Sequence, residues 1–177
     1  MKQFIISLFL SVMVLIPTVC IAQIPYEALN IGGIYFYQDM NEIIEKYGDS
    51  VTSTPRAPKG FDYFFKVDDA LVKIFPFKGK IMSFSIDNKS KLKTAAGIGI
   101  AMKYEDIVNA YGEPDYVEAG SDSMPSKVYY FTPNVYPDTP VAWTSYNCSL
   151  IFTLYGEFID SIAVEHKFKF DTPQIMP

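Results

Sequence analysis

The stretch Gly97-Ile-Gly-Ile-Ala-Met-Lys-Tyr-Glu-Asp-Ile-Val-Asn-Ala-Tyr-Gly-Glu113 decides the fold, because the chain contains a second version of it. The earlier version reads Gly33-Ile-Tyr-Phe-Tyr-Gln-Asp-Met-Asn-Glu-Ile-Ile-Glu-Lys-Tyr-Gly-Asp49. The aligned positions with identical residues are Gly33/Gly97, Ile34/Ile98, Ile43/Ile107, Tyr47/Tyr111 and Gly48/Gly112. Self-similarity of this kind is typical of repeated structural units, so it predicts two tandem units of one architecture.

Both versions predict a short helix, because their apolar residues follow the i, i+3, i+4, i+7 spacing of one helical face. These residues are Met40, Ile43, Ile44 and Tyr47 in the first version and Tyr104, Ile107, Val108 and Tyr111 in the second. Asp39 is the expected N-cap of the first helix, with Glu42 as its capping-box partner. The glycines that follow the last apolar residues, Gly48 and Gly112, are expected to end the helices.

After each helix the hydrophobic pattern changes to a period of two, which indicates strands. The strands expected in the first unit span residues 51–54, 61–67, 71–77 and 80–87. In the second unit, residues 150–155 and 158–165 repeat the pattern of the last two. Tight turns between consecutive strands make them antiparallel. The predicted fold class is therefore α+β, with two tandem repeats at 24–93 and 94–170, each a short helical segment packed on an antiparallel sheet.

The second unit contains an inserted loop, expected at residues 133–147. The spacing between equivalent positions of the two units grows between the helix and the last strands, which locates the insertion before residue 150. The segment is rich in proline and includes Tyr136, Trp143 and Tyr146. A long proline-rich loop in a compact unit is uncommon and often functional. The tail at 171–177 is expected to fray.

Residues 1–22 have the pattern of a cleaved signal peptide. Lys2 supplies the positive charge, residues 4–16 form an almost unbroken apolar run, and Cys20-Ile21-Ala22 offers small residues for cleavage before Gln23. We expect export to the periplasm or to the outside of the cell, with an uncleaved anchor as the alternative. Lipid attachment at Cys20 is disfavoured, because bacterial lipoproteins carry Gly, Ala or Ser where this chain carries Val19.

The charge and cysteine content exclude several classes of function and structure. The chain has 15 Lys and Arg against 20 Asp and Glu, a formal net charge of −5. An acidic chain without a Lys/Arg cluster argues against nucleic acids and anionic lipid surfaces as partners. Once Cys20 is removed with the signal, Cys148 is the single remaining cysteine, so no intrachain disulfide is possible. Cys148 is expected as a buried small hydrophobe, the alternative being a reactive or intermolecular thiol.

The sequence shows no pattern for catalysis, a metal or a cofactor. His166 is the only histidine, and it lies in the register of the core-facing Ile162 and Val164, so a structural or surface role is expected. No Cys/His cluster has metal-ligand spacing, and Asp68-Asp69, Asp160 and Asp171 are isolated acids in turns or strands, so paired catalytic carboxylates are not expected. Gly97-Ile-Gly-Ile lacks the third glycine and the Lys-Ser/Thr pair of a phosphate loop. We therefore expect a protein that is not an enzyme and has no cofactor.

Strand alternation separates two faces of the predicted sheet. The face expected to pack on the helices carries Val72, Ile74, Met82, Phe84, Ile86, Leu150, Phe152, Leu154, Ile162 and Val164. The opposite face carries Lys73, Phe75, Phe77, Ser83, Ser85, Ile151, Thr153, Tyr155 and Ser161. Aromatic residues mixed with small polar residues suit partner binding. The predicted partner-binding residues are Lys73, Phe75, Phe77, Thr153 and Tyr155, with Tyr136, Trp143 and Tyr146 of the inserted loop.

Two alternatives stay open for these residues. In the first, the inserted loop, or Tyr63 and Phe65, covers the aromatic residues of the sheet and leaves no surface for a partner. In the second, Trp143 and Tyr146 pin the loop to the sheet instead of anchoring a partner. Both alternatives depend on which way the side chains face.

The segment from Gly97-Ile98 through Asp106-Ile107-Val108 to Tyr111-Gly112-Glu113-Pro114 resembles the repeat of the beta-lactamase inhibitory protein fold. It is similar also to the single-unit small lipoprotein of the outer-membrane barrel-assembly machine. The first copy departs from the pattern, because Ser50 stands where proline is expected. The resemblance implies two helix-plus-sheet units whose sheets join into one curved, protein-binding surface.

Two further departures from the inhibitor family limit what the resemblance implies. The family has a disulfide in each unit, which this chain cannot form. The acidic hairpin that inserts into a lactamase has no residue-by-residue counterpart in this chain. The resemblance therefore does not imply lactamase inhibition. The preferred reading is an exported, inhibitor-like module that binds a protein or peptide. An envelope assembly or scaffold component is the alternative, followed by a binder of small apolar or glycan ligands.

Overall fold

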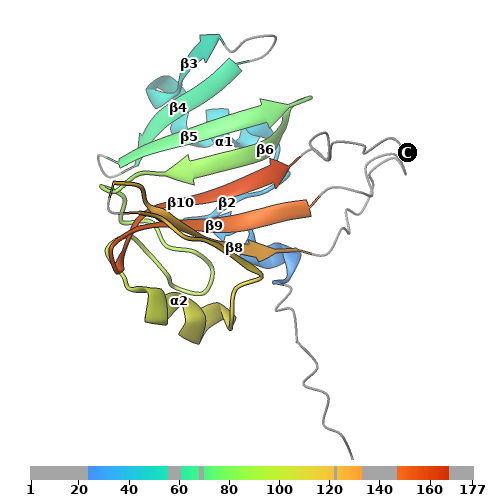
Figure 1. The fold of residues 1–177 in the computed structure, drawn as a ribbon. Helices are drawn as coiled ribbons and strands as arrows, with labels where there is room; N and C mark the ends of the chain where they lie inside the picture. Colours follow the sequence, from blue (N-terminus) through green and yellow to red (C-terminus); the bar gives the residue numbers. More distant parts are fainter. Residues whose placement is uncertain (1–23, 56–60, 68–69, 122, 133–146, 168–177) are drawn as a thin grey trace, which may run out of the picture.

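Eight antiparallel strands form one continuous sheet, and two α-helices pack against one of its faces (Figure 1). The computed structural model describes residues 24–55, 61–67, 70–121, 123–132 and 147–167. The helical elements are η1 (Tyr26–Ala28), α1 (Met40–Tyr47), η2 (Gly48–Ser50) and α2 (Tyr104–Tyr111). The strands are β1 (Asn30–Ile31), β2 (Ile34–Tyr35), β3 (Thr52–Pro55), β4 (Phe61–Val67), β5 (Ala70–Phe77), β6 (Lys80–Ile86), β7 (Tyr116–Glu118), β8 (Ser126–Phe131), β9 (Asn147–Tyr155) and β10 (Phe158–Lys167). The predicted α+β class is confirmed.

The large sheet has the strand order β3-β4-β5-β6-β10-β9-β8-β7. Each half of the chain supplies four strands that follow one another in sequence. The last strands of the two halves, β6 and β10, pair with each other, with Ile162 opposite Ile86 and Val164 opposite Phe84. This pairing joins the two sheets into one surface. β1 and β2 form a separate two-stranded sheet that the sequence pattern does not predict.

The loop before each helix is fastened to the last strand of its own half by a similar hydrogen bond. The Tyr37 N–H donates to the Ile81 carbonyl at 2.7 Å, and the Ala101 N–H donates to the Ile159 carbonyl at 2.8 Å. In both halves the α-helix is followed by four strands of the large sheet, although the first half also contains η1, β1, β2 and η2. The equivalence of the halves as tandem repeats, with a boundary at residues 93 and 94, stays a prediction.

The core lies between the sheet and the helices. All ten residues predicted to face the helices are buried, none more than 3% exposed. They pack with Ile43 of α1 and Ile107 of α2 in one hydrophobic cluster. Tyr47 of α1 stacks on Phe65 of β4, with ring centroids 4.4 Å apart. Each helix has eight residues, too few to be stable alone, so this packing holds both in place.

Both helices end at a glycine, as predicted. Gly48 has φ 45° and Gly112 has φ 81°, a backbone conformation that side-chain-bearing residues adopt only with strain. The structure contains only one of the two hydrogen bonds expected for the capping box of α1. Asp39 does cap the helix by accepting a hydrogen bond from the Asn41 N–H at 2.9 Å.

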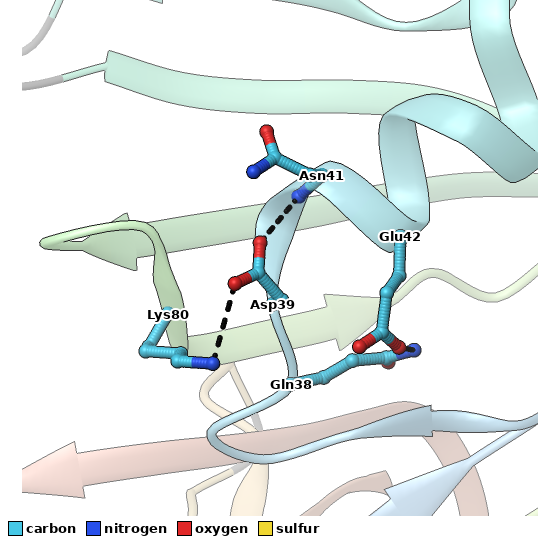
Figure 2. Close-up of polar contacts among 5 residues, drawn as sticks. All are labelled: Gln38, Asp39, Asn41, Glu42 and Lys80. Atoms are coloured by element: carbon cyan, nitrogen blue, oxygen red, sulfur yellow. Dashed lines mark hydrogen bonds and ion pairs between the residues drawn. The ribbon is translucent and has the colours of Figure 1, made fainter.

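The Glu42 carboxylate does not return to the Asp39 N–H, as the capping box required. It accepts a hydrogen bond from Gln38 Nε2 at 2.9 Å (Figure 2). Gln38 stands four residues before Glu42, so its side-chain amide competes with the backbone for this carboxylate.

Three predicted segments lie outside the described residues. They are the signal segment at 1–22, the tail at 171–177 and the inserted loop at 133–147, apart from Asn147, where β9 begins. Within the described part of the chain, no helix is long and apolar enough to cross a membrane.

Candidate functional site

The open face of the sheet is the face turned away from the helices. Side chains of β5 alternate between the two faces, since Val72 and Ile74 are fully buried in the core while Lys73 is exposed and Phe75 is half-buried. From Met82 to Ile86 the side chains of β6 alternate in the same way. Among the described residues no helix lies over this face (Figure 1).

The central hollow is a depression of about 220 Å³ in the open face, on β5, β6 and β10. It is lined by Lys73, Phe75, Ser83, Phe84, Ser85, Ala163 and Glu165.

The strand register explains why the sheet is hollowed at this point. Ser85 of β6 lies between Lys73 and Ala163, and the neighbouring Ser83 lies between Phe75 and Glu165. The small side chains therefore form the floor, and the longer side chains on the flanking strands form the walls.

Charge is not balanced within the central hollow. The Lys73 ammonium forms an ion pair with Asp62 Oδ2 at 3.1 Å. It also lies 5.7 Å from the centre of the Phe64 ring, so both of its contacts are on β4. The exposed Glu165 carboxylate makes no hydrogen bond or ion pair with the described residues. Within the described part of the chain, the hollow therefore has one negative charge that no cation contacts.

The serine hydroxyls on the floor are also unused. Neither Ser83 nor Ser85 makes a side-chain hydrogen bond in the part of the chain that the structure describes. Both side chains are half-buried. A bound group could therefore use both oxygens as acceptors without breaking a bond within the protein.

An aromatic cluster borders the open face on β7 and β8. The Tyr129 ring lies between Tyr116 and Phe131, at centroid distances of 5.5 and 6.3 Å. The Tyr129 hydroxyl donates a hydrogen bond to Glu118 Oε2 at 2.9 Å. Burial, assisted by the nearby Glu118 carboxylate, raises the pKa of Tyr129 to about 12. Tyr129 is therefore neutral at physiological pH and keeps this hydrogen bond.

The structure divides the predicted partner-binding residues of the sheet. Lys73 and Phe75 lie together in the central hollow. Phe77 and Tyr155, 37% and 56% exposed, stand at the turns of the β5–β6 and β9–β10 hairpins. Because β6 and β10 are antiparallel, these turns lie at opposite ends of the sheet (Figure 1). Thr153 is half-buried and lies opposite Lys127 of β8.

Tyr136, Trp143 and Tyr146 lie outside the described residues. The alternative that Tyr63 and Phe65 cover the aromatic residues of the open face is wrong. Phe65 is buried against Tyr47 of α1, and Tyr63, two residues away on the same strand, shares its face.

Ile151 departs from the expectation of an accessible residue on the open face. It is only 4% exposed. The register places it directly opposite Tyr129 of β8 and Ala163 of β10. A large ring directly opposite on the neighbouring strand shields an aliphatic side chain from solvent, which accounts for its burial.

The sequence analysis missed Ala163 and Glu165. Both alternate with the buried Ile162 and Val164 along β10, so the period that assigned Ser161 to the open face assigns them there too. Their position beside the serines of β6 depends on the β6–β10 pairing, which local sequence patterns do not reveal.

Cys148 and His166 are the two chemically distinctive side chains on the opposite face. Cys148 forms no disulfide with the described residues and is 1% exposed, as expected for a buried small hydrophobe. His166 lies opposite it in the strand register and stacks on Phe36 at 6.0 Å. Burial lowers the pKa of His166 below its usual range. No group of three or more His, Cys, Asp or Glu among the described residues is arranged to hold a metal.

Comparison with known proteins does not assign the chain to a family. The sequence matches no protein-family model and no curated protein. A solved structure that is similar to it is a candidate beta-lactamase inhibitor protein from Streptococcus mutans. That protein shares 17% identity over 73% of this chain and 82% of its own, with a TM-score of 0.27. Similarity at this level carries no argument about activity, so the proposals below rest on the geometry of the open face.

Proposed function

We propose that this chain is an exported, non-enzymatic module that binds a protein or peptide through the open face of its sheet. The observation that carries the proposal is the central hollow, which lies on the face without a helix and has aromatic residues around it. Phe75 forms one wall of the hollow. Binding hot spots combine aromatic anchors of this kind with pockets from which water is excluded on binding.

The size of the hollow favours a macromolecular partner over a small ligand. Pockets for small molecules typically enclose about 300–1,000 Å³ and surround most of the ligand. The central hollow is smaller, about 220 Å³, and lies on an open sheet. It therefore fits one side chain of a partner better than a whole glycan or apolar ligand.

The sheet is suited to recognition because its side chains are held in place before a partner arrives. Strand pairing on both sides fixes the backbone of β5, β6 and β10, and the packed core behind it fixes the spacing of the open-face residues. A surface that needs little ordering on binding loses less conformational entropy. An inhibitor-like role, in which this face occludes the active site of an enzyme, belongs to the same proposal.

Export is part of the proposal and rests on the pattern of residues 1–22. Mass spectrometry of the native protein should find a mature chain that begins at Gln23. A chain that retains residues 1–22, or that carries a lipid on Cys20, would contradict this part of the proposal.

Site-specific photocrosslinking tests the binding surface. A photoreactive phenylalanine analogue replaces Phe75 in one variant and Ile44 in another. Ile44 is a matched control, because it is 42% exposed on α1, on the opposite side of the sheet. We expect the analogue at position 75 to capture a defined protein in the native host, and the analogue at position 44 to capture none.

The same crosslinking experiment has a clear contrary outcome. Equal capture from the two positions, or capture from position 44 alone, would show that the open face is not the binding surface. For a captured enzyme, the inhibitor-like role is tested by adding the purified chain and measuring turnover. Undiminished turnover at saturating chain would exclude it.

A further inference from the structure

The central hollow carries information about the chemistry of its occupant. Its two charged walls come from different strands, Lys73 from β5 and Glu165 from β10, with the serine floor between them. The Lys73 charge is offset by Asp62 at 3.1 Å, and the ammonium is drawn toward β4. The Glu165 charge has no such partner in the described chain. Counting the described residues, an incoming group therefore meets a net negative site.

The neutral residues that line the hollow also favour a cationic occupant. Ser83 and Ser85 offer hydroxyl oxygens that no donor of the described protein uses. Lysine and arginine side chains carry only donors, and three to five of them, so they can satisfy a carboxylate and two hydroxyls together. Phe75 adds an apolar wall, against which the long aliphatic stem of a lysine or arginine can pack.

We propose that the central hollow receives a basic side chain, lysine or arginine, from the protein partner. In this arrangement Glu165 pairs with the cationic head, Ser83 and Ser85 accept its remaining hydrogen bonds, and Phe75 packs against its stem. This inference rests on the proposed function, since it names the chemistry that the open face selects in its partner.

Other occupants fit less well. An acidic side chain would have to draw Lys73 away from Asp62 and would lie close to the Glu165 carboxylate, where like charges repel. An apolar side chain would desolvate the carboxylate and both hydroxyls without replacing their bonds to water, which costs free energy. A basic side chain avoids both penalties.

Short peptides test the inference on the full mature chain. The probes are three blocked tripeptides, Gly-X-Gly, in which X is arginine, the neutral arginine analogue citrulline, or glutamate. Backbone amide chemical shifts are followed by NMR during titration of each peptide. We expect the arginine peptide to shift the amides of Ser83, Ser85 and Ala163, and the other two peptides to leave them unchanged.

Two variants separate charge from shape. Glu165→Gln should weaken arginine-peptide binding by about twofold to fivefold, the usual effect of losing one exposed ion pair. Glu105→Gln is its matched control, because Glu105 is an exposed acid on α2, and it should leave binding unchanged. Ser85→Leu fills the hollow and should abolish the shifts, whereas Thr52→Leu, at an exposed position of β3 outside the hollow, should not.

The inference fails if the arginine peptide leaves these amides unshifted, if citrulline binds equally well, or if Glu165→Gln has no effect. Its failure is distinguishable from failure of the proposed function. If position 75 still crosslinks a partner while the peptide result is negative, the open face binds a protein of different chemistry. If position 75 captures nothing, the proposed function itself is wrong.

Discussion

Asp39 makes two contacts that fix the start of α1. One carboxylate oxygen accepts a hydrogen bond from the Asn41 N–H at 2.9 Å, and the other lies 3.3 Å from the Lys80 ammonium at the start of β6 (Figure 2). A single side chain therefore caps the helix and ties it to the sheet. The backbone bond and the ammonium together hold the pKa of Asp39 below its ordinary value of 3.8.

Asp39→Asn should lower the melting temperature at neutral pH. It should also make the melting temperature less sensitive to a fall in pH. The lowered pKa means that the charged form of Asp39 stabilises the fold above pH 3.8, and that this stability is lost as the pH falls through the lowered pKa. The measurement is thermal unfolding of wild type and variant from pH 7 to pH 2.

The difference in melting temperature should be largest at pH 7 and should shrink toward pH 2. Glu45→Gln is the control for removal of one charge from α1, because Glu45 is exposed on that helix and makes no hydrogen bond within the described residues. A constant difference across the whole range would show that the Asp39 charge does not matter.

At the scale of elements, the end of α2 is fastened to β8 by one buried tyrosine. The Tyr130 hydroxyl donates a hydrogen bond to the Gly112 carbonyl at 2.7 Å, and the side chain is fully buried. The Tyr130 ring also lies 5.3 Å from the Tyr111 ring in the last turn of α2. A short helix gains from such a contact, because the last carbonyls of any helix have no partner within it.

Tyr130→Phe should reduce the free energy of unfolding by about 1 kcal/mol, the usual net value of one hydrogen bond. Chemical denaturation with an unchanged m-value gives the measurement. Tyr116→Phe is the control, because Tyr116 is 55% exposed and its hydroxyl makes no hydrogen bond within the described chain. A loss as large in Tyr116→Phe would mean that the Tyr130 effect does not come from the bond to Gly112.

The helices and strands also show which features of the structure can be predicted from the sequence. The helix spacing through Ile43 and Ile107 and the strand alternation around Val72 and Leu150 are local, so the core face follows directly from residue order. The pairing of β6 with β10 joins distant segments and leaves no local signal. For this reason Lys73 and Phe75 were assigned to the site while Glu165, across the hollow, was missed.

A similar reason explains why Phe77 and Tyr155 lie apart. Both follow the strand alternation that assigns them to the open face, and both are exposed. Whether two exposed residues are neighbours depends on the direction in which their strands run. The antiparallel β6–β10 pair places the two hairpin turns at opposite ends of the sheet.

At the scale of the whole molecule, the β6–β10 pairing joins the two halves in one sheet. Ile162 of β10 is fully buried and lies opposite Ile86 of β6, and Val164 pairs in the same way with Phe84. The central hollow lies across the same junction, with walls from both halves. We therefore expect the stability of the open face around the hollow to depend on the junction rather than on either half alone.

Ile162→Ala should destabilise the protein by about 2–5 kcal/mol through lost burial and an unfilled cavity. Because the junction is shared, hydrogen-exchange protection should fall equally in β5 of the first half and in β9 of the second. Ile44→Ala is the matched control, because Ile44 is 42% exposed on α1, and it should change protection little. If Ile162→Ala lowers protection in β8 and β9 but leaves β4 and β5 unchanged, the halves fold independently, and the hollow is only a contact between two separate domains.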